Sequence, residues 1–338
     1  MYKNVYKYDD MKRSEHMAVR QSVGWYFWTH QLLEITGTDA AKFLDYIYPN
    51  NIATLKVGKD RYTTMLNDDG EIVDDVIVMR LEENKFWIST LFLRQTFTWL
   101  ESHKVGYDVQ FNNVTDEWNM FAVQGPTSKN MVASLTAMPI DELKYFSFMK
   151  NMIKDKEVFV NRGGFTGEKW GFEIYCHSAD TEVVESVLRS TAQEYGGRQV
   201  TDFQIMAWTL PTESGFYYMR DLAHTNPFEV GLETNINWDK SFIGKDALLK
   251  VKEIGPEREM VGFEVPEADV YIRSRHLGGP GEPVFIDGEE IGWVVKFVYS
   301  YVKDVNNGYI LAQKGVLKMG DKLKIHGYDA IITDKKWI

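Results

Sequence analysis

Two acidic positions in strand-like segments have surroundings that suit chemistry, and the first is Glu173. It lies in the alternating run Phe172–Cys176, directly after a stretch, Arg162–Gly171, that contains four glycines. Side chains alternate between the two faces of a strand, so Glu173 should point away from its apolar neighbours. Glycines let a backbone approach a ligand closely, and a carboxylate beside such a loop can accept two N–H groups from a flat heterocycle. The same residues could also form a plain hairpin with a solvated glutamate.

The second acidic position is the pair Asp74 and Asp75 in the strand-like run Ile72–Met79. Adjacent strand residues face opposite ways, so only one of these two carboxylates can look into a cavity. A partly desolvated aspartate could accept a proton from a ligand nitrogen, or orient it, because burial raises the pKa of a carboxyl group. A solvated hairpin edge is the alternative interpretation of the pair.

Composition excludes several classes of function. The chain has 338 residues and a net charge of −11 without a dense basic run, so we expect no binding to nucleic acid or to a membrane surface. No apolar run approaches the roughly 20 residues that a membrane span needs. The single cysteine, Cys176, predicts a reducing, cytoplasmic location and is itself expected in the core. The seven histidines share no ligand spacing with it, so no metal site is expected.

The carboxylates must be positioned by a mixed set of elements. Up to residue 253 the strand and helix signals alternate in a β-α-β-β-α-β rhythm, which is typical of α+β units with helices on one face of an antiparallel sheet. A linker follows at Ile254–Pro256, and residues 257–338 then read as short strands divided by turns. This second pattern predicts a small β-barrel or sandwich.

Five separated segments resemble motifs of the glycine-cleavage T-protein (aminomethyltransferase) superfamily of tetrahydrofolate enzymes. In chain order they are Ala18–Gly24 (AVRxSVG), Gly70–Val78 (GGIxDDxxV), Phe121–Pro126 (xAxQGP), Arg162–Tyr175 (RTGYTGEDGFEI) and Asn226–Leu232 with Phe242–Leu248 (NPxExGL…FxGKxAL). The resemblance runs from about residue 15 to the C-terminus. It implies an α+β fold arranged as a three-domain ring with folate in the central hole. Two interleaved ferredoxin-like units would occupy residues 1–253, and a C-terminal β-barrel would occupy residues 257–338.

The resemblance also implies a cofactor and the residues that bind it. The cofactor would be tetrahydrofolate, with Glu173 holding the pterin ring and Phe165 taking the place of a loop tyrosine near the folate. Asp75 would be the catalytic carboxylate beside the N5 and N10 region of the folate. Ser89 and Thr90 stand where the family has asparagines and would also contact the folate.

Other segments depart from the family pattern where a T-protein meets its aminomethyl-lipoyl substrate. Trp28–Leu32 replaces VSHMG, Met206–Glu213 lacks the arginines of ARDxxRLE, and Lys296–Val302 replaces TSGxxSP. These departures favour the demethylase relatives, which move a methyl group from a small O-, S- or N-methyl donor to N5 of tetrahydrofolate, with an aryl methyl ether preferred here. Alignment of nucleophile and methyl group could supply on the order of 7–11 kcal/mol of the barrier reduction.

An aryl-oxide leaving group would benefit from a nearby hydrogen-bond donor, and the altered segments offer candidates. We expect His30 and Tyr26 as catalytic donors, and Trp28, Gln31 and Tyr299 as contacts of the small methyl donor. Each has a structural alternative. The aromatic residues could simply fill a core, and His30 could be a hydrogen-bonded histidine at a strand end.

Two other functions stay open at this point. A true aminomethyltransferase of the glycine cleavage system would dock a lipoyl carrier protein through a basic surface. A non-catalytic folate-binding scaffold, like the iron–sulfur-assembly branch of the superfamily, would carry a KGCYxGQE segment, whereas Tyr218–Leu222 contains no cysteine. The presence of Asp75 favours an enzyme.

Overall fold

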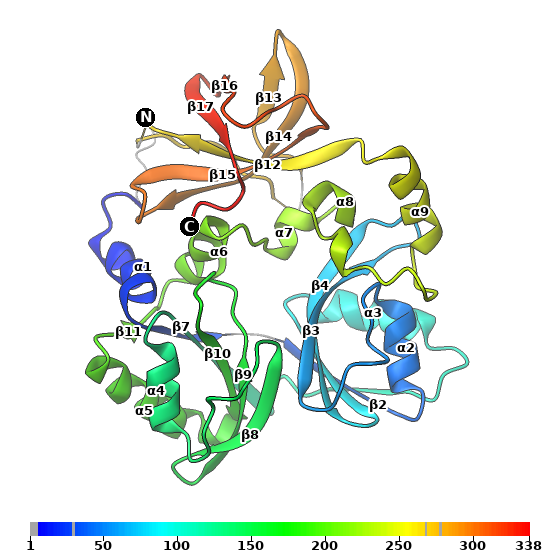
Figure 1. Ribbon diagram of the computed structural model, residues 1–338, viewed down its shortest axis with the longest axis vertical. Coiled ribbons are helices and arrows are strands. Elements are labelled where there is room, and N and C mark those ends of the chain that lie inside the picture. The colour runs from blue at the N-terminus through cyan, green and yellow to red at the C-terminus, as the bar shows by residue number, and fades with distance from the viewer. Residues whose placement is uncertain (1–5, 29–30, 268, 277–278) are drawn as a thin grey trace.

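The computed structural model describes residues 6–28, 31–267, 269–276 and 279–338. Three units surround a common middle, which holds the short helices that connect them (Figure 1). One unit is a six-stranded sheet, and the other two are the halves of a longer, curled sheet with helices against it. The predicted α+β fold with a three-part ring is therefore confirmed.

Eleven strands form the long sheet, which runs continuously through both helix-covered units. In spatial order they are β11 (Arg198–Gln199), β1 (Gly24–Trp28), β7 (Trp118–Gln124), β10 (Gly171–His177), β9 (Lys156–Arg162), β8 (Ser147–Ile153), β3 (Lys59–Leu66), β4 (Ile72–Glu82), β5 (Lys85–Thr90), β2 (Gln31–Thr36) and β6 (Gln110–Asn113). The halves join where β3 and β8 pair at Lys59 and Ser147. Strand β1 lies in one half and β2 in the other, so the two units are interleaved in sequence.

Each half buries one face of its sheet under a pair of helices. Helices α2 (Ala40–Ile47) and α3 (Leu93–His103) share a core with β2 to β5, whereas α4 (Ser128–Leu135) and α5 (Thr181–Glu194) share one with β1, β7, β9 and β10. The opposite faces of both halves contribute to a single further core. Alternation along a strand explains this division, because Trp25 belongs to the helix-covered core and Tyr26 to the shared one.

The six-stranded sheet is formed by the C-terminal part of the chain. Its spatial order is β13 (Pro283–Ile286), β14 (Glu289–Ser300), β15 (Val305–Gln313), β12 (Arg258–Val265), β17 (Tyr328–Thr333) and β16 (Lys322–Ile325). The outer strands β13 and β16 contact each other, so the sheet nearly closes into the barrel that the sequence predicts. Helix α9 (Lys245–Ile254) ends just before β12. We propose that the boundary between the two regions of the chain lies at residues 255–257.

Short helical segments connect the units and occupy the middle of the molecule (Figure 1). They are the π-helical turn η2 (Ile205–Thr209), α6 (Leu210–Glu213), α7 (Met219–Leu222), α8 (Pro227–Val230) and η3 (Glu233–Asn235). A further short turn, η1 (Ser178–Asp180), leads from β10 into α5. A longer helix, α1 (Asp10–Gln21), packs beside η2. In the described parts of the chain, every helix is too short or too polar to cross a membrane.

Candidate active site

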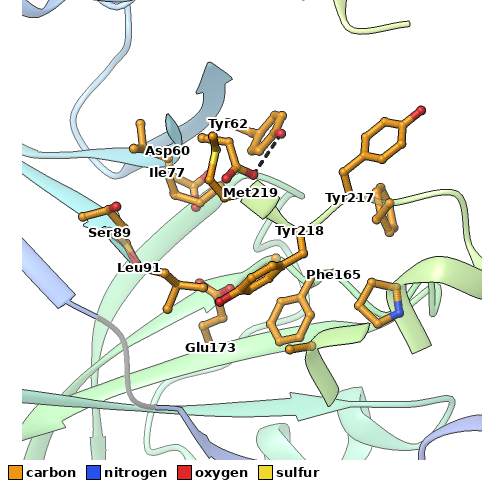
Figure 2. A pocket seen from close by; sticks show the side chains of 18 of the residues that line it. Asp60, Tyr62, Ile77, Ser89, Leu91, Phe165, Glu173, Tyr217, Tyr218 and Met219 are labelled. Carbon is orange, nitrogen blue, oxygen red and sulfur yellow. Dashed lines mark hydrogen bonds between the residues drawn. The ribbon is translucent and has the colours of Figure 1, made fainter. Parts of the chain in front are cut away.

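A cavity of about 460 Å³ lies among the three units, and Figure 2 shows part of its lining. Its wall combines side chains from β1, β3, β4, β5, β7, β9 and β10 with the connecting segment 207–235. Eight aromatic residues line the wall: Trp28, Tyr62, Tyr145, Phe146, Phe165, Phe216, Tyr217 and Tyr218. The charged side chains among its described lining residues are Asp60, Asp75, Glu173 and Lys335. An aromatic cavity with a few placed charges suits a planar ligand.

Asp75 is the carboxylate of the Asp74–Asp75 pair that lines the cavity. Alternation along β4 turns Asp74 the other way, where the hydroxyl groups of Thr90 and Thr96 donate to its Oδ2. The Tyr62 hydroxyl donates to Oδ2 of Asp75 at 3.1 Å. Burial, and then the nearby charge of Asp74, raise the pKa of Asp75 to about 7. Asp75 can therefore gain or lose a proton near neutral pH.

Glu173 projects into the same cavity from β10, on the face opposite Phe172 and Ile174. Its Oε2 accepts hydrogen bonds from Asn161 Nδ2 and from the Tyr175 hydroxyl, each at 3.1 Å. Both bonds involve the same oxygen, so Oε1 has no hydrogen-bond partner among the described residues. Burial raises the pKa of Glu173, and the two hydrogen bonds oppose that rise. The side chain is held in place and keeps one oxygen for a ligand.

The glycine-rich loop before β10 is shaped mainly by protein contacts. A Cβ at Gly164 would lie 2.2 Å from Gln124 Oε1, and one at Gly171 would lie 2.5 Å from the same atom. Gly167 has φ +84°, and a Cβ there would meet Ser214 at 1.8 Å. These three glycines make room for Gln124 and Ser214, which anchor the loop. The expected close approach of the backbone to a ligand stays a prediction for Gly163 and Gly164, which line the cavity.

Two aromatic residues that line the cavity with Glu173, Trp28 and Phe165, pack against each other. The rings of Trp28 and Phe165 have centroids 4.9 Å apart, and Trp28 stacks on Phe203 at 5.7 Å. Figure 2 shows Phe165 and Tyr218 on the same side of the view as Glu173. A flat ring bound to the Glu173 carboxylate would therefore meet aromatic surface rather than water.

Comparisons with known proteins agree with this geometry. The family model described as the GCVT N-terminal domain matches residues 1–240. An aminomethyltransferase of Thermotoga sp. (strain RQ2) is 31% identical over 314 residues, covering 92% of this chain and 84% of the relative. An aminomethyltransferase of Thermoanaerobacter pseudethanolicus is 33% identical over 324 residues, with the same coverage of both chains. The chain belongs to the aminomethyltransferase (T-protein) family.

One solved structure shows the same fold as this family member. It is the glycine cleavage system aminomethyltransferase T from Bartonella henselae, which superposes with a TM-score of 0.83 over 97% of this chain and 89% of the other. The sequences are 24% identical, so this likeness concerns the fold alone. The resemblance to the T-protein superfamily that the sequence motifs indicate is thus confirmed by the family match and by the relatives.

Most of the residues expected at the site of this T-protein relative line its cavity. They are Glu173, Asp75, Phe165, Ser89, Thr90 and Trp28. Together they come from four strands (β1, β4, β5 and β10) and one loop. Alternation along the strands turns Trp28, Asp75 and Glu173 toward the cavity, whereas the Thr90 hydroxyl donates to Asp74 on the other face of the sheet.

Three other expected residues do not line the cavity. Tyr26 packs in the shared core, with its ring centroid 5.6 Å from that of Trp28. Gln31 Oε1 accepts the backbone N–H of Leu93 at 2.8 Å, at the start of α3. Tyr299 is buried and donates its hydroxyl to Asp304. These contacts support the structural alternative for Tyr26 and Tyr299 and give Gln31 a protein partner at the start of α3, whereas His30 lies outside the described residues.

Sequence reasoning missed other polar residues of the cavity wall, among them Asp60, Tyr62, Asn161 and Lys335. Asp60 and Asn161 carry a sequence signal, since each is a polar residue at an inward position of a strand. The other two have a weaker signal. Lys335 reaches the cavity from just before the C-terminus, and its Nζ donates to Val230 O at 3.0 Å.

Proposed function

We propose that this protein transfers a one-carbon unit to tetrahydrofolate in an aminomethyltransferase reaction, with an aminomethylated lipoyl carrier as the donor. Tetrahydrofolate is the one-carbon acceptor of the family. The observation that carries the proposal is the presence of Glu173 and Asp75 in one aromatic cavity, each held by hydrogen bonds to neighbouring side chains. The names of the relatives favour this donor over a small methyl compound.

The residues of the cavity fit a reduced folate. A pterin ring offers N–H groups for which the unpaired Oε1 of Glu173 is an acceptor, and the rings of Trp28, Phe165 and Tyr218 match its flat shape. The acidic tail of folate needs a cation, and Lys335 is the cation among the described lining residues. Folate would supply the nitrogen that takes up the one-carbon unit. Asp75, ionised above about pH 7, would accept a hydrogen bond or a proton there.

A demethylase that uses a small O-, S- or N-methyl donor is the second candidate. The observation that favours it is the aromatic and thioether surface formed by Phe165, Tyr218 and Met219, which would suit a methoxyaryl ring. The substituted segments add less support. Gln31 and Tyr299, which belong to them, are engaged elsewhere in the protein.

One assay separates the two candidates. The purified protein is incubated with tetrahydrofolate and, in separate reactions, an aminomethylated lipoyl carrier, a methoxybenzoate, a methylated sulfonio acid and a methylamine. Methylenetetrahydrofolate and ammonia formed from the carrier support the aminomethyltransferase. Methyltetrahydrofolate formed from a small donor instead establishes the demethylase, and turnover with none of the donors contradicts both.

The Glu173→Gln variant tests the folate anchor. We expect its affinity for tetrahydrofolate to fall by roughly 10- to 100-fold, because an amide presents a donor to a ligand N–H where the carboxylate presents an acceptor. Isothermal titration calorimetry measures the Kd. Glu157→Gln is the matched control, since Glu157 lies on the neighbouring β9 with its side chain 49% exposed. Equal affinity of the Glu173 variant and wild type would remove Glu173 from the binding site.

A further inference from the structure

Asp60 is a buried carboxyl group that the proposed reaction does not yet use. It lies on β3, is 3% exposed and lines the cavity. Both carboxyl oxygens are shielded from solvent, and neither accepts a well-formed hydrogen bond from a described residue. Burying a polar group without partners is unfavourable by several kcal/mol. A group left in this state on a cavity wall is suited to a ligand that provides the missing partner.

Asp60 and Glu173 flank the same amide side chain. Asn161 on β9 is paired in register with Glu173 on β10 and with Phe148 on β8, and the backbone N–H of Asp60 donates to the β8 side at Phe146 O, 3.3 Å away. Asn161 Nδ2 donates to Glu173 at 3.1 Å, and the same amide lowers the pKa of Asp60. The two carboxyl groups therefore lie on one wall of the cavity with Asn161 between them.

The charged and titratable groups around the pair favour one shared proton. Burial, and then the charge of Glu173, raise the pKa of Asp60 to about 7, against smaller opposing effects of Asn161 and Lys59. Tyr145, which follows α4, and Tyr175 on β10 also face the pair, and burial with both carboxylates raises the pKa of each phenol.

The proton has a preferred place within the pair. Glu173 accepts two well-formed hydrogen bonds, which stabilise its ionised form, whereas Asp60 accepts none. Two neighbouring carboxyls that hold one proton titrate as a unit, and here the proton is best held on Asp60.

A pterin offers a matching edge. On one side of its 2-amino group lies N3–H, a donor, and on the other side lies N1, an acceptor. An ionised carboxylate can accept from N3–H and from one amino N–H. The second amino N–H and N1 together require an acceptor beside a donor, which is what a protonated carboxyl provides.

We propose that Asp60 and Glu173 together bind the aminopyrimidine edge of the pterin, Glu173 as the ionised acceptor and Asp60 as the protonated partner of N1 and the 2-amino group. This inference rests on the folate-binding function proposed above. It assigns Asp60 to recognition of the 2-amino group and not to catalysis.

The test compares Asp60→Ala with Asp60→Asn, using 5-formyltetrahydrofolate as the probe and calorimetry at pH 6 and pH 8.5. An asparagine amide has both an acceptor and a donor, so it imitates the protonated acid. We expect Asp60→Ala to weaken binding about tenfold or more at pH 6, and Asp60→Asn to bind like wild type. Wild-type affinity should fall between the two pH values because Asp60 loses its proton above about pH 7, whereas the affinity of Asp60→Asn should stay constant.

Three further comparisons make the result specific. Asp68→Asn, at an exposed position of the turn after β3, is the matched control and should bind like wild type at both pH values. An analogue without the 2-amino group keeps only the N1 contact with Asp60, so Asp60→Ala should weaken its binding less than it weakens binding of the parent compound. Circular dichroism and thermal unfolding show whether each variant is folded, independently of ligand.

The outcomes separate this inference from the proposed function. Absence of folate binding to wild type would overturn both. Normal binding by wild type, with loss in Glu173→Gln and none in Asp60→Ala, would overturn the inference alone. Equal loss in Asp60→Asn and Asp60→Ala would also overturn it, because the asparagine would then fail to replace the acid.

Discussion

Replacing Asp75 with asparagine should lower kcat by about 10²- to 10⁴-fold, the usual contribution of a general acid or base. The Kd for tetrahydrofolate should change by less than about threefold, since an interaction that matters chiefly in the transition state lowers kcat and leaves ground-state binding intact. Asparagine keeps the size of the side chain and can still accept the Tyr62 hydroxyl, but it cannot accept a proton. Single-turnover kinetics and calorimetry measure the two quantities separately.

The pH dependence of turnover gives an independent test of the same role. Asp75 must be ionised to accept a proton, so wild-type kcat should fall as pH drops below about 7. The Tyr62 hydrogen bond lowers the pKa of Asp75, and Tyr62→Phe should therefore move the acid side of the profile to higher pH. Asp75→Asn should show no such limb. A profile unchanged in both variants would assign the limb to another group, and full activity of Asp75→Asn would exclude the catalytic role.

Strand faces were the most predictable part of this molecule. Alternation alone places Glu173 opposite Phe172 and Ile174, and it allows only one of Asp74 and Asp75 into a cavity. These are local properties of the backbone, so a single sequence contains them. The rhythm of strands and helices up to residue 253 and the strand-rich region after residue 257 were also predictable from local patterns.

Contacts between distant segments were not predictable in this way. Tyr26 and Trp28 share a face of β1, yet Trp28 lines the cavity and Tyr26 does not. Which of these two side chains reaches the cavity depends on where β1 lies relative to the other units of the molecule, and the sequence of β1 does not specify that position. Asp60 and Lys335 meet the cavity only after strands and termini far apart in the sequence have come together.

The glycine-rich loop shows the limit of interpreting a motif by residue type. Its glycines are necessary, but Gly164 and Gly171 accommodate Gln124, and Gly167 accommodates Ser214. The loop is further tied down by Arg20, whose Nη1 donates to Thr166 O at 2.7 Å. The loop that carries Phe165 therefore owes its shape to a polar cluster outside the cavity.

That cluster centres on Glu213, whose replacement by alanine should lower stability by about 3–5 kcal/mol, the usual effect of removing one partner from a buried ion pair. Glu213 has a fully buried side chain at the end of α6, and its Oε2 accepts from Arg20 Nη2 at 2.7 Å and lies 3.2 Å from His16 Nε2. Its Oε1 accepts the Ser300 hydroxyl of β14. One carboxylate thus joins α1, the connecting segment and the barrel. Without it, the buried Arg20 guanidinium keeps one ion pair, with Glu168 at 2.6 Å, and loses the other.

Scanning calorimetry should show the change as a fall in Tm on the order of 5–10 °C. Glu185→Ala, which breaks the exposed pair with Arg189 on α5, is the control and should change stability by less than about 0.5 kcal/mol. The double variant Arg20→Met, Glu213→Leu should be more stable than Glu213→Ala, because it removes both charges together.

The effect of Glu213 should also depend on pH in a definite direction. Burial raises the pKa of Glu213, but the interactions of its carboxylate with His16 and Arg20 lower it by more. The pKa of Glu213 therefore lies below its usual value. A carboxylate with a lowered pKa stabilises the folded state at neutral pH and loses that contribution as the pH falls through its folded pKa. The difference in Tm between wild type and Glu213→Ala should accordingly be full at pH 7 and shrink in acid below pH 4.5. A difference that is constant with pH would mean that Glu213 acts through packing. No difference at pH 7 would mean that the barrel and the glycine-rich loop are held together by other contacts.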